Sequence, residues 1–97
     1  MKIEIKHDLD TNGMTPIVLV PLTNSDQKVT LYETDFDTLM KEGLYPVWRL
    51  SSGKVLERGS QISVARLVMD AKENEKIYFK DGNVGNMRRD NSPARPC

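Results

Sequence analysis

The stretch Lys28-Val-Thr-Leu-Tyr-Glu-Thr-Asp-Phe-Asp-Thr-Leu-Met-Lys-Glu-Gly43 changes its apolar period halfway along. In its first five residues apolar side chains alternate with polar ones, which is the pattern of a half-buried strand. From Phe36 onward the apolar residues recur at helical spacing, acidic residues lie at the positive N-terminal end, and Gly43 can end the helix. We therefore predict a strand followed by a helix over residues 34–42, whose apolar stripe should cover a sheet.

The residues before this stretch supply further strands. Pro16 to Pro21 enclose a β-branched run between two prolines, and prolines are tolerated at strand ends. The polar segment 23–27 can turn the chain, so residues 16–21 and 28–32 should form a hairpin. Residues 2–6 alternate charged and apolar side chains and predict a short first strand.

The residues after the helix predict a second hairpin. Residues 45–50 and 54–58 flank Ser51-Ser-Gly53, where glycine suits a tight turn. Trp48 and Val55 should lie together on its apolar face.

The last third of the chain has weaker patterns. Residues 61–69 fit either period, and we favour a strand that leads into a short helix. Residues 76–80 predict a strand, residues 81–83 a tight turn, and residues 86–91 a short polar helix or capped turn. Residues 92–97 contain two prolines and no apolar anchor, so we expect a disordered tail.

Together these patterns predict one α+β domain over residues 1–91. It should contain an antiparallel sheet of four to six short strands, one main helix and a short C-terminal helical turn. The predicted core residues are Phe36, Leu39, Trp48, Val64, Leu67 and Ile77.

Composition excludes several functional classes. With one histidine, His7, and one cysteine, Cys97, there is no ligand set for structural zinc, and we expect no metal and no cofactor. No apolar run approaches the roughly 20 residues of a membrane span. The first residues lack the apolar region of a secretory signal. We therefore expect a cytoplasmic protein with no membrane contact.

The net charge of zero conceals an asymmetry between the two parts of the chain. Residues 1–40 carry three basic and seven acidic side chains, a net charge of −4, and residues 41–97 carry eleven basic and seven acidic, a net charge of +4. The two parts can simply attract each other. Alternatively, the basic part forms a surface suited to phosphates.

An ordered set of motifs resembles one known family. The set comprises Pro21-Leu-Thr23, an acidic helix, a Trp-containing hairpin, the segment 64–69 with its Arg-Leu pair, Asp81-Gly-Asn83, and Asn86-Met-Arg-Arg-Asp-Asn91. In this order, over residues 21–91, the chain resembles phage and bacterial proteins of the HNH homing-endonuclease group, especially a catalytically degenerate branch.

The departures from this family concern the catalytic residues. Active members carry an Asp-His pair in the strand before the Asp-Gly-Asn turn, where the histidine activates water and its neighbours hold a metal ion. This chain has Tyr78 and Phe79 there, and Met87 stands in place of a later asparagine. The resemblance therefore implies a protein that is not an enzyme and has no catalytic residues.

What remains of the family pattern is a set of polar side chains. Arg88 and Arg89 follow the turn with Met87 as their apolar neighbour, so we expect exposed guanidinium groups whose removal leaves the fold intact. They either pair with local acids such as Asp90 or Asp81, or they face phosphates. The candidate residues for binding nucleic acid or a partner are Arg66, Lys80, Arg88, Arg89 and Asn91.

The preferred hypothesis is a non-enzymatic DNA-binding module of phage or mobile-element type, which binds double-stranded DNA. The alternative is a small phage counter-defence protein that binds and inhibits a host nuclease or nucleic-acid-guided complex. Neither hypothesis involves a small-molecule cofactor.

Overall fold

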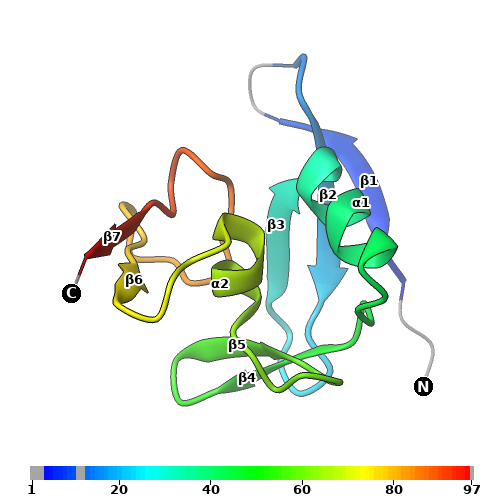
Figure 1. Ribbon diagram of the computed structural model, residues 1–97. Helices are drawn as coiled ribbons and strands as arrows, with labels where there is room; N and C mark the ends of the chain where they lie inside the picture. The colour runs from blue at the N-terminus through cyan, green and yellow to red at the C-terminus, as the bar shows by residue number, and fades with distance from the viewer. Residues whose placement is uncertain (1–3, 11–12, 97) are drawn as a thin grey trace.

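A computed structural model describes residues 4–10 and 13–96 of the chain (Figure 1). In these residues seven strands and two helices occur in the order β1 (Lys6–Leu9), β2 (Pro16–Pro21), β3 (Lys28–Tyr32), α1 (Glu33–Lys41), β4 (Trp48–Ser51), β5 (Lys54–Glu57), α2 (Val64–Met69), β6 (Glu75–Ile77) and β7 (Ala94–Pro96). The strands form three antiparallel sheets, β1-β2-β3, β4-β5 and β6-β7. The predicted α+β class is confirmed, and its strands are divided among three small sheets.

The β1-β2-β3 sheet supplies the first layer of the core. The hairpin predicted over residues 16–21 and 28–32 is confirmed. Its register places Val18 opposite Leu31 and Val20 opposite Val29, and all four side chains are fully buried. Of the strand predicted over residues 2–6, residues 2 and 3 lie outside the described residues, residues 4 and 5 are not in a strand, and β1 runs over Lys6–Leu9.

Helix α1 follows β3 directly and covers the sheet (Figure 1). It lies within one residue of the predicted range at each end, and Gly43 just beyond it has a φ of 83°, the left-handed conformation that glycine adopts easily. Phe36 and Leu39 face the core. The ring of Phe36 meets Trp48 edge to face, with centroids 6.3 Å apart.

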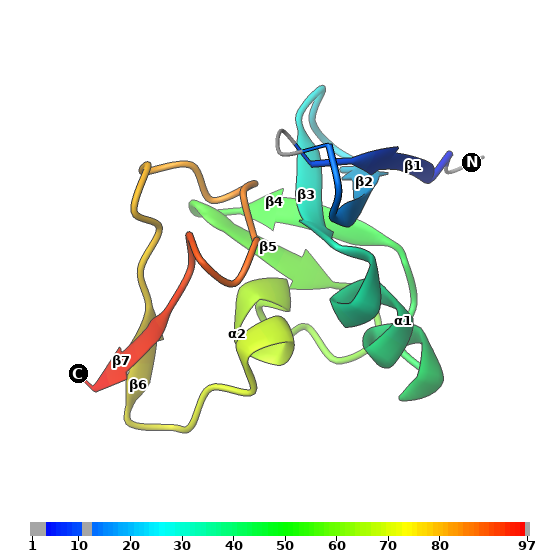
Figure 2. The ribbon, with the colours of Figure 1, turned by 90° about the horizontal axis from the view of Figure 1, so that it is seen from above.

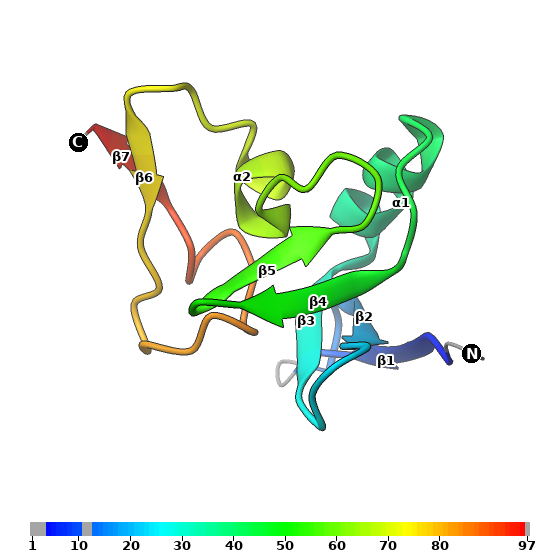
Figure 3. The ribbon, with the colours of Figure 1, turned by 90° about the horizontal axis from the view of Figure 1, so that it is seen from below.

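The β4-β5 hairpin forms the second layer. Its two loop residues, Ser52 and Gly53, both have positive φ, as a tight turn that matches strand twist requires. Trp48 and Val55 are both buried, as predicted. Figures 2 and 3 show the hairpin running between the β1-β2-β3 sheet and α2.

The core differs in part from the predicted one. Phe36, Leu39, Trp48 and Val64 are buried as predicted, whereas Leu67 and Ile77 are half-buried and pack against the core edge. The main buried core residues outside that predicted set are Val18, Val20, Val29, Leu31, Val68 and Met87. Within the sheet the burial is confined to β2 and β3, because α1 packs against these two strands and the returning C-terminal segment pairs with β3, whereas β1 stays exposed.

The C-terminal residues depart from the expected disordered tail. Residues 94–96 form β7 and pair with β6, and the buried Ser92 hydroxyl donates a hydrogen bond to the Arg88 carbonyl at 2.8 Å. The β6-β7 hairpin lies on the far side of α2 from β1, β2 and β3 (Figures 1 and 2). The prolines fit here because each strand has a single partner within the described residues. Cys97 lies outside these residues.

The segment before β7 returns to the edge of β3. Thr30 donates its N–H to the Gly85 carbonyl at 2.7 Å and accepts from the Met87 N–H at 2.8 Å, so Asn86 pairs with β3 in a parallel bridge. Met87 is thereby buried in the core, with 1% of its surface exposed. No helix forms over residues 86–91, which contain the capped turn that was the other predicted form.

Replacing Gly85 with alanine is expected to lower the free energy of unfolding by about 1–3 kcal/mol, because it overpacks a tight backbone contact. An alanine Cβ would lie 2.9 Å from the Lys28 carbonyl oxygen, a backbone atom that cannot easily move away. Urea unfolding followed by circular dichroism measures the loss. An unchanged midpoint would show that the segment does not pack closely against β3.

Candidate nucleic-acid interface

Arg88 and Arg89 make long-range ion pairs. The Nη2 of Arg88 lies 3.1 Å from Oδ1 of Asp10, and the Nε of Arg89 lies 2.8 Å from Oδ1 of Asp35. Arg89 also donates to the Val68 carbonyl at 3.0 Å. The expected pairing with Asp81 or Asp90 is therefore wrong. These two arginines connect the basic and acidic parts of the chain.

The predicted exposure is wrong for Arg88 and confirmed for Arg89. The Arg88 side chain is 22% exposed, and its Nε is buried without a hydrogen-bond partner within the described residues. The Arg89 side chain is 54% exposed, but its Nε and Nη2 are both engaged. Removing them should therefore disturb the fold, contrary to the expectation that the fold stays intact.

Arg66 and Asn91 hold loops together. Arg66 donates to the carbonyls of Lys72 and Glu75, which closes the connection between α2 and β6. Asn91 accepts from the Asp81 N–H and donates to its carboxylate at 3.0 Å.

The Asp81 carboxylate organises the turn that follows β6. Hydrogen bonds from the Asn86 side chain, the Asn83 N–H and the Asn91 side chain lower the pKa of Asp81, so the carboxylate stays charged. The Asp81-Gly-Asn83 turn and the asparagines that follow it thus fix a loop in this structure.

Lys80 belongs to a different arrangement, in which exposed residues alternate along an extended segment. Lys76, Tyr78 and Lys80 are exposed, whereas Ile77 and Phe79 between them are half-buried. The Tyr78 N–H donates to the Pro93 carbonyl and the Lys80 N–H to the Asn91 carbonyl, so the segment stays extended beyond β6. Because side chains alternate across a strand, the three exposed residues share one face.

Arg95 joins this face from β7. It lies directly opposite Lys76 in the register, and its guanidinium carbon is 5.7 Å from the centre of the Tyr78 ring. We call Lys76, Tyr78, Lys80 and Arg95 the basic stripe. Like charges placed opposite each other destabilise a strand pair. Within residues 4–10 and 13–96, none of the three cations forms an ion pair with a carboxylate.

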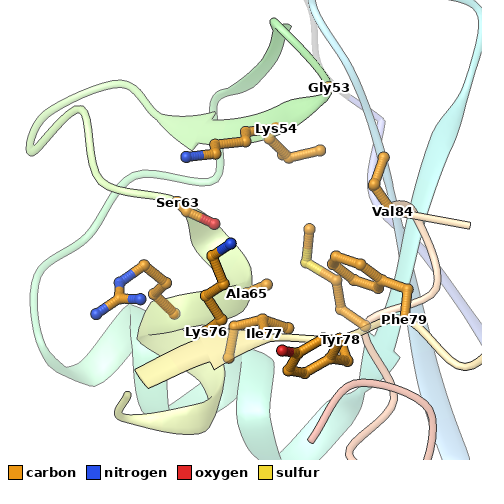
Figure 4. Close-up of a pocket in the computed structure, with 12 residues that line it drawn as sticks. Gly53, Lys54, Ser63, Ala65, Lys76, Ile77, Tyr78, Phe79 and Val84 are labelled. Atoms are coloured by element: carbon orange, nitrogen blue, oxygen red, sulfur yellow. The ribbon is translucent and has the colours of Figure 1, made fainter. Parts of the chain in front are cut away.

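A pocket of about 320 Å³ lies beside the basic stripe (Figure 4). Its lining is mainly apolar, with three cations and no acidic side chain: Gly53, Lys54, Val55, Ser63, Ala65, Arg66, Lys76, Ile77, Tyr78, Phe79, Val84 and Met87. Lys54 on β5 and Lys76 on β6 approach the same side of it, with Ser63 between them, whereas Phe79 and Val84 lie on the other side.

Tyr78 and Phe79 both belong to this site. Tyr78 is part of the basic stripe, and Phe79 forms a wall of the pocket. Neither side chain offers a carboxylate or imidazole. Among the described residues there is also no group of three or more His, Cys, Asp or Glu that could hold a metal ion.

Some of these residues could have been identified from the sequence. The alternation of Lys76, Tyr78 and Lys80 is visible there, because cations separated by an aromatic residue are typical of nucleic-acid contacts. Lys54 and Arg95 give no such signal. One follows a hairpin turn, and the other lies in a segment that reads as disordered.

Comparisons with known proteins give no indication of the function of this chain. No family model, no curated protein and no solved structure matches the chain. No helix in the described part of the chain is long and apolar enough to span a membrane.

Proposed function

We propose that this protein is a non-enzymatic DNA-binding module whose basic stripe contacts phosphates. The observation that carries the proposal is the stripe itself, with three exposed cations around an exposed tyrosine and, among the described residues, no neutralising carboxylate. Phosphates of double-stranded DNA would relieve the repulsion between Lys76 and Arg95. Tyr78, which is 47% exposed, supplies a flat surface within the stripe.

The proposed contacts differ from those expected from the sequence. Arg88 and Arg89 are held by Asp10 and Asp35, so binding is assigned to Lys76, Lys80 and Arg95. Of the earlier candidates, Lys80 belongs to the stripe, and Arg66 lines the neighbouring pocket.

The resemblance to degenerate homing endonucleases supports the remaining parts of the proposal. The protein is of phage or mobile-element type, has no nuclease activity because Tyr78 and Phe79 cannot hold a metal or activate water, and acts in the cytoplasm, where DNA is accessible.

Replacing Lys76 and Lys80 together with alanine is expected to weaken duplex binding and its dependence on salt. Each phosphate contact contributes about 0.9 to the slope of log affinity against log salt, so the slope should fall in magnitude by about 1.8. Fluorescence anisotropy with a labelled duplex over a series of salt concentrations measures it.

The matched control removes two lysines at a distance from the basic stripe. Lys6 on β1 and Lys41 on α1 are exposed, and their elements lie on the opposite side of the molecule from β6 and β7 (Figure 1). Alanine at both positions changes the net charge equally and should leave the slope nearly unchanged. If wild-type protein does not bind the duplex even at low salt, the proposal fails, and the counter-defence protein is favoured.

A further inference from the structure

We infer that the pocket beside the basic stripe accepts one unpaired nucleobase, so that the protein prefers DNA with an extruded or single-stranded nucleotide over a continuous duplex. This inference rests on the proposed DNA binding and adds to it the form of DNA that is preferred.

The size and lining of the pocket fit a flat aromatic ligand. Its volume of about 320 Å³ is at the lower end of the range of small-ligand sites, roughly 300–1,000 Å³. The buried side chains of Val55 and Met87 contribute an apolar interior, and Ile77 and Phe79 provide half-buried walls. A nucleobase has two flat faces that gain from such contacts.

The cations beside the pocket fit the phosphates on either side of that base. Lys54 and Lys76 come from different strands and approach one side, where the Ser63 hydroxyl lies between them (Figure 4). Ser63 makes no capping hydrogen bond to α2, so its hydroxyl can bond a ligand. No acidic side chain in the lining repels a phosphate.

Other ligand classes use only part of this arrangement. An acidic peptide would satisfy the lysines and leave the apolar interior without a flat partner. A purely apolar ligand would fill the interior and leave the two lysines without anionic partners. A nucleotide uses both, and in a strand it lies next to the phosphates that the basic stripe binds.

The inference predicts a preference that depends on pairing. Extruding a paired base requires that it be unstacked and unpaired, whereas a bulged base is already free. Because stacking of one base on protein side chains changes affinity by roughly 5- to 150-fold, a bulged duplex should bind tighter than the continuous duplex by a factor in this range.

The test uses three labelled DNA probes and the full chain. One is a continuous duplex, the second has one unpaired thymidine in its centre, and the third has an abasic residue in place of that thymidine. The abasic probe keeps the phosphates and the flexibility but lacks the base. We expect the thymidine bulge to bind tighter than both other probes. Thymidine monophosphate as a competitor tests whether a free nucleotide is the ligand.

Two variants locate the effect in the pocket. Tyr78→Ala removes a lining ring and should reduce the ratio of bulge affinity to abasic affinity. Tyr45→Ala removes a ring that is 58% exposed and does not line the pocket, so it should leave the ratio unchanged. Because both positions are exposed, both variants should fold, as circular dichroism can verify.

Each outcome decides between the two proposals. Equal binding of all three probes would overturn the inference and leave DNA binding in place. Equal binding of the two bulged probes, both above the duplex, would assign the preference to flexibility and overturn it as well. If free thymidine monophosphate binds as tightly as the bulged probe, the ligand is a free nucleotide, and the inferred preference for a form of DNA is overturned. If the protein binds none of the DNA probes, both proposals are overturned.

Discussion

Replacing Trp48 with alanine is expected to lower the free energy of unfolding by about 3–5 kcal/mol, the usual cost of removing a large buried aromatic side chain. Trp48 is 1% exposed, its ring meets Phe36 edge to face, and its indole N–H donates to the Tyr45 carbonyl at 2.9 Å. The side chain therefore joins β4 to α1. A small domain is stable by only about 5–15 kcal/mol, so a substantial part of this margin should be lost.

Urea unfolding followed by far-ultraviolet circular dichroism measures this loss, since the variant has no tryptophan fluorescence. Trp48→Phe is the graded control, because it keeps an aromatic ring beside Phe36 and should lose less stability. A Trp48→Ala protein with the wild-type midpoint would show that the two layers do not depend on this side chain.

Replacing Glu57 with glutamine is expected to lower the free energy of unfolding at neutral pH by about 3 kcal/mol. The Glu57 side chain is 1% exposed, and its two carboxylate oxygens accept hydrogen bonds from the Tyr45 N–H at 2.9 Å and the Ser60 N–H at 2.6 Å. Glutamine would place an amide donor against one of these N–H groups. A buried donor would then lack an acceptor.

This stabilisation should depend on pH. Burial, the largest single influence, raises the pKa of Glu57, but the N–H groups of Ser60, Tyr45 and Gly59 together outweigh it and lower the pKa from 4.5 to about 2. Because the folded pKa lies below the unfolded one, the stabilisation is complete above the unfolded value and is lost as pH falls toward about 2.

The difference in stability between wild type and Glu57→Gln isolates this carboxylate from others that titrate in acid. Urea unfolding of both proteins from about pH 7 to about pH 3 should show a difference that stays constant down to about pH 5 and then shrinks as the pH falls through the unfolded pKa. A difference that stays constant over this range would mean that the ionised form of Glu57 is not favoured by folding.

The elements that the sequence predicts well are those whose signals are local. The hairpin of β2 and β3 and the helix α1 depend on residues within one short segment, such as the alternation before Tyr32 and the glycine at position 43. Pairing of β6 with β7 joins Ile77 to Ala94, and the intervening residues return to β3 first. No local pattern predicts such a route.

The candidate site also depends on contacts between residues far apart in the sequence, which local patterns do not predict. The sequence around Arg88 and Arg89 does not predict their ion pairs, because their partners, Asp10 and Asp35, are acids far earlier in the chain. Asp35 reads as an ordinary acidic residue in the first turn of a helix, and it also holds Arg89 across 54 residues. Lys54 reaches the pocket only because the β4-β5 hairpin packs against α2.

The bridge between Asn86 and Thr30 also bears on self-association. An uncovered strand edge offers free N–H and carbonyl groups to the edge of another molecule, and such pairing is a common route to aggregation. Residues 85–87 occupy the edge of β3 and use the N–H and the carbonyl of Thr30. The other edge of this sheet is β1, where Lys6 and Asp8 are exposed and would bring charge into any edge-to-edge pairing. The C-terminal segment thus keeps a valine- and leucine-rich sheet from extending into a neighbouring copy.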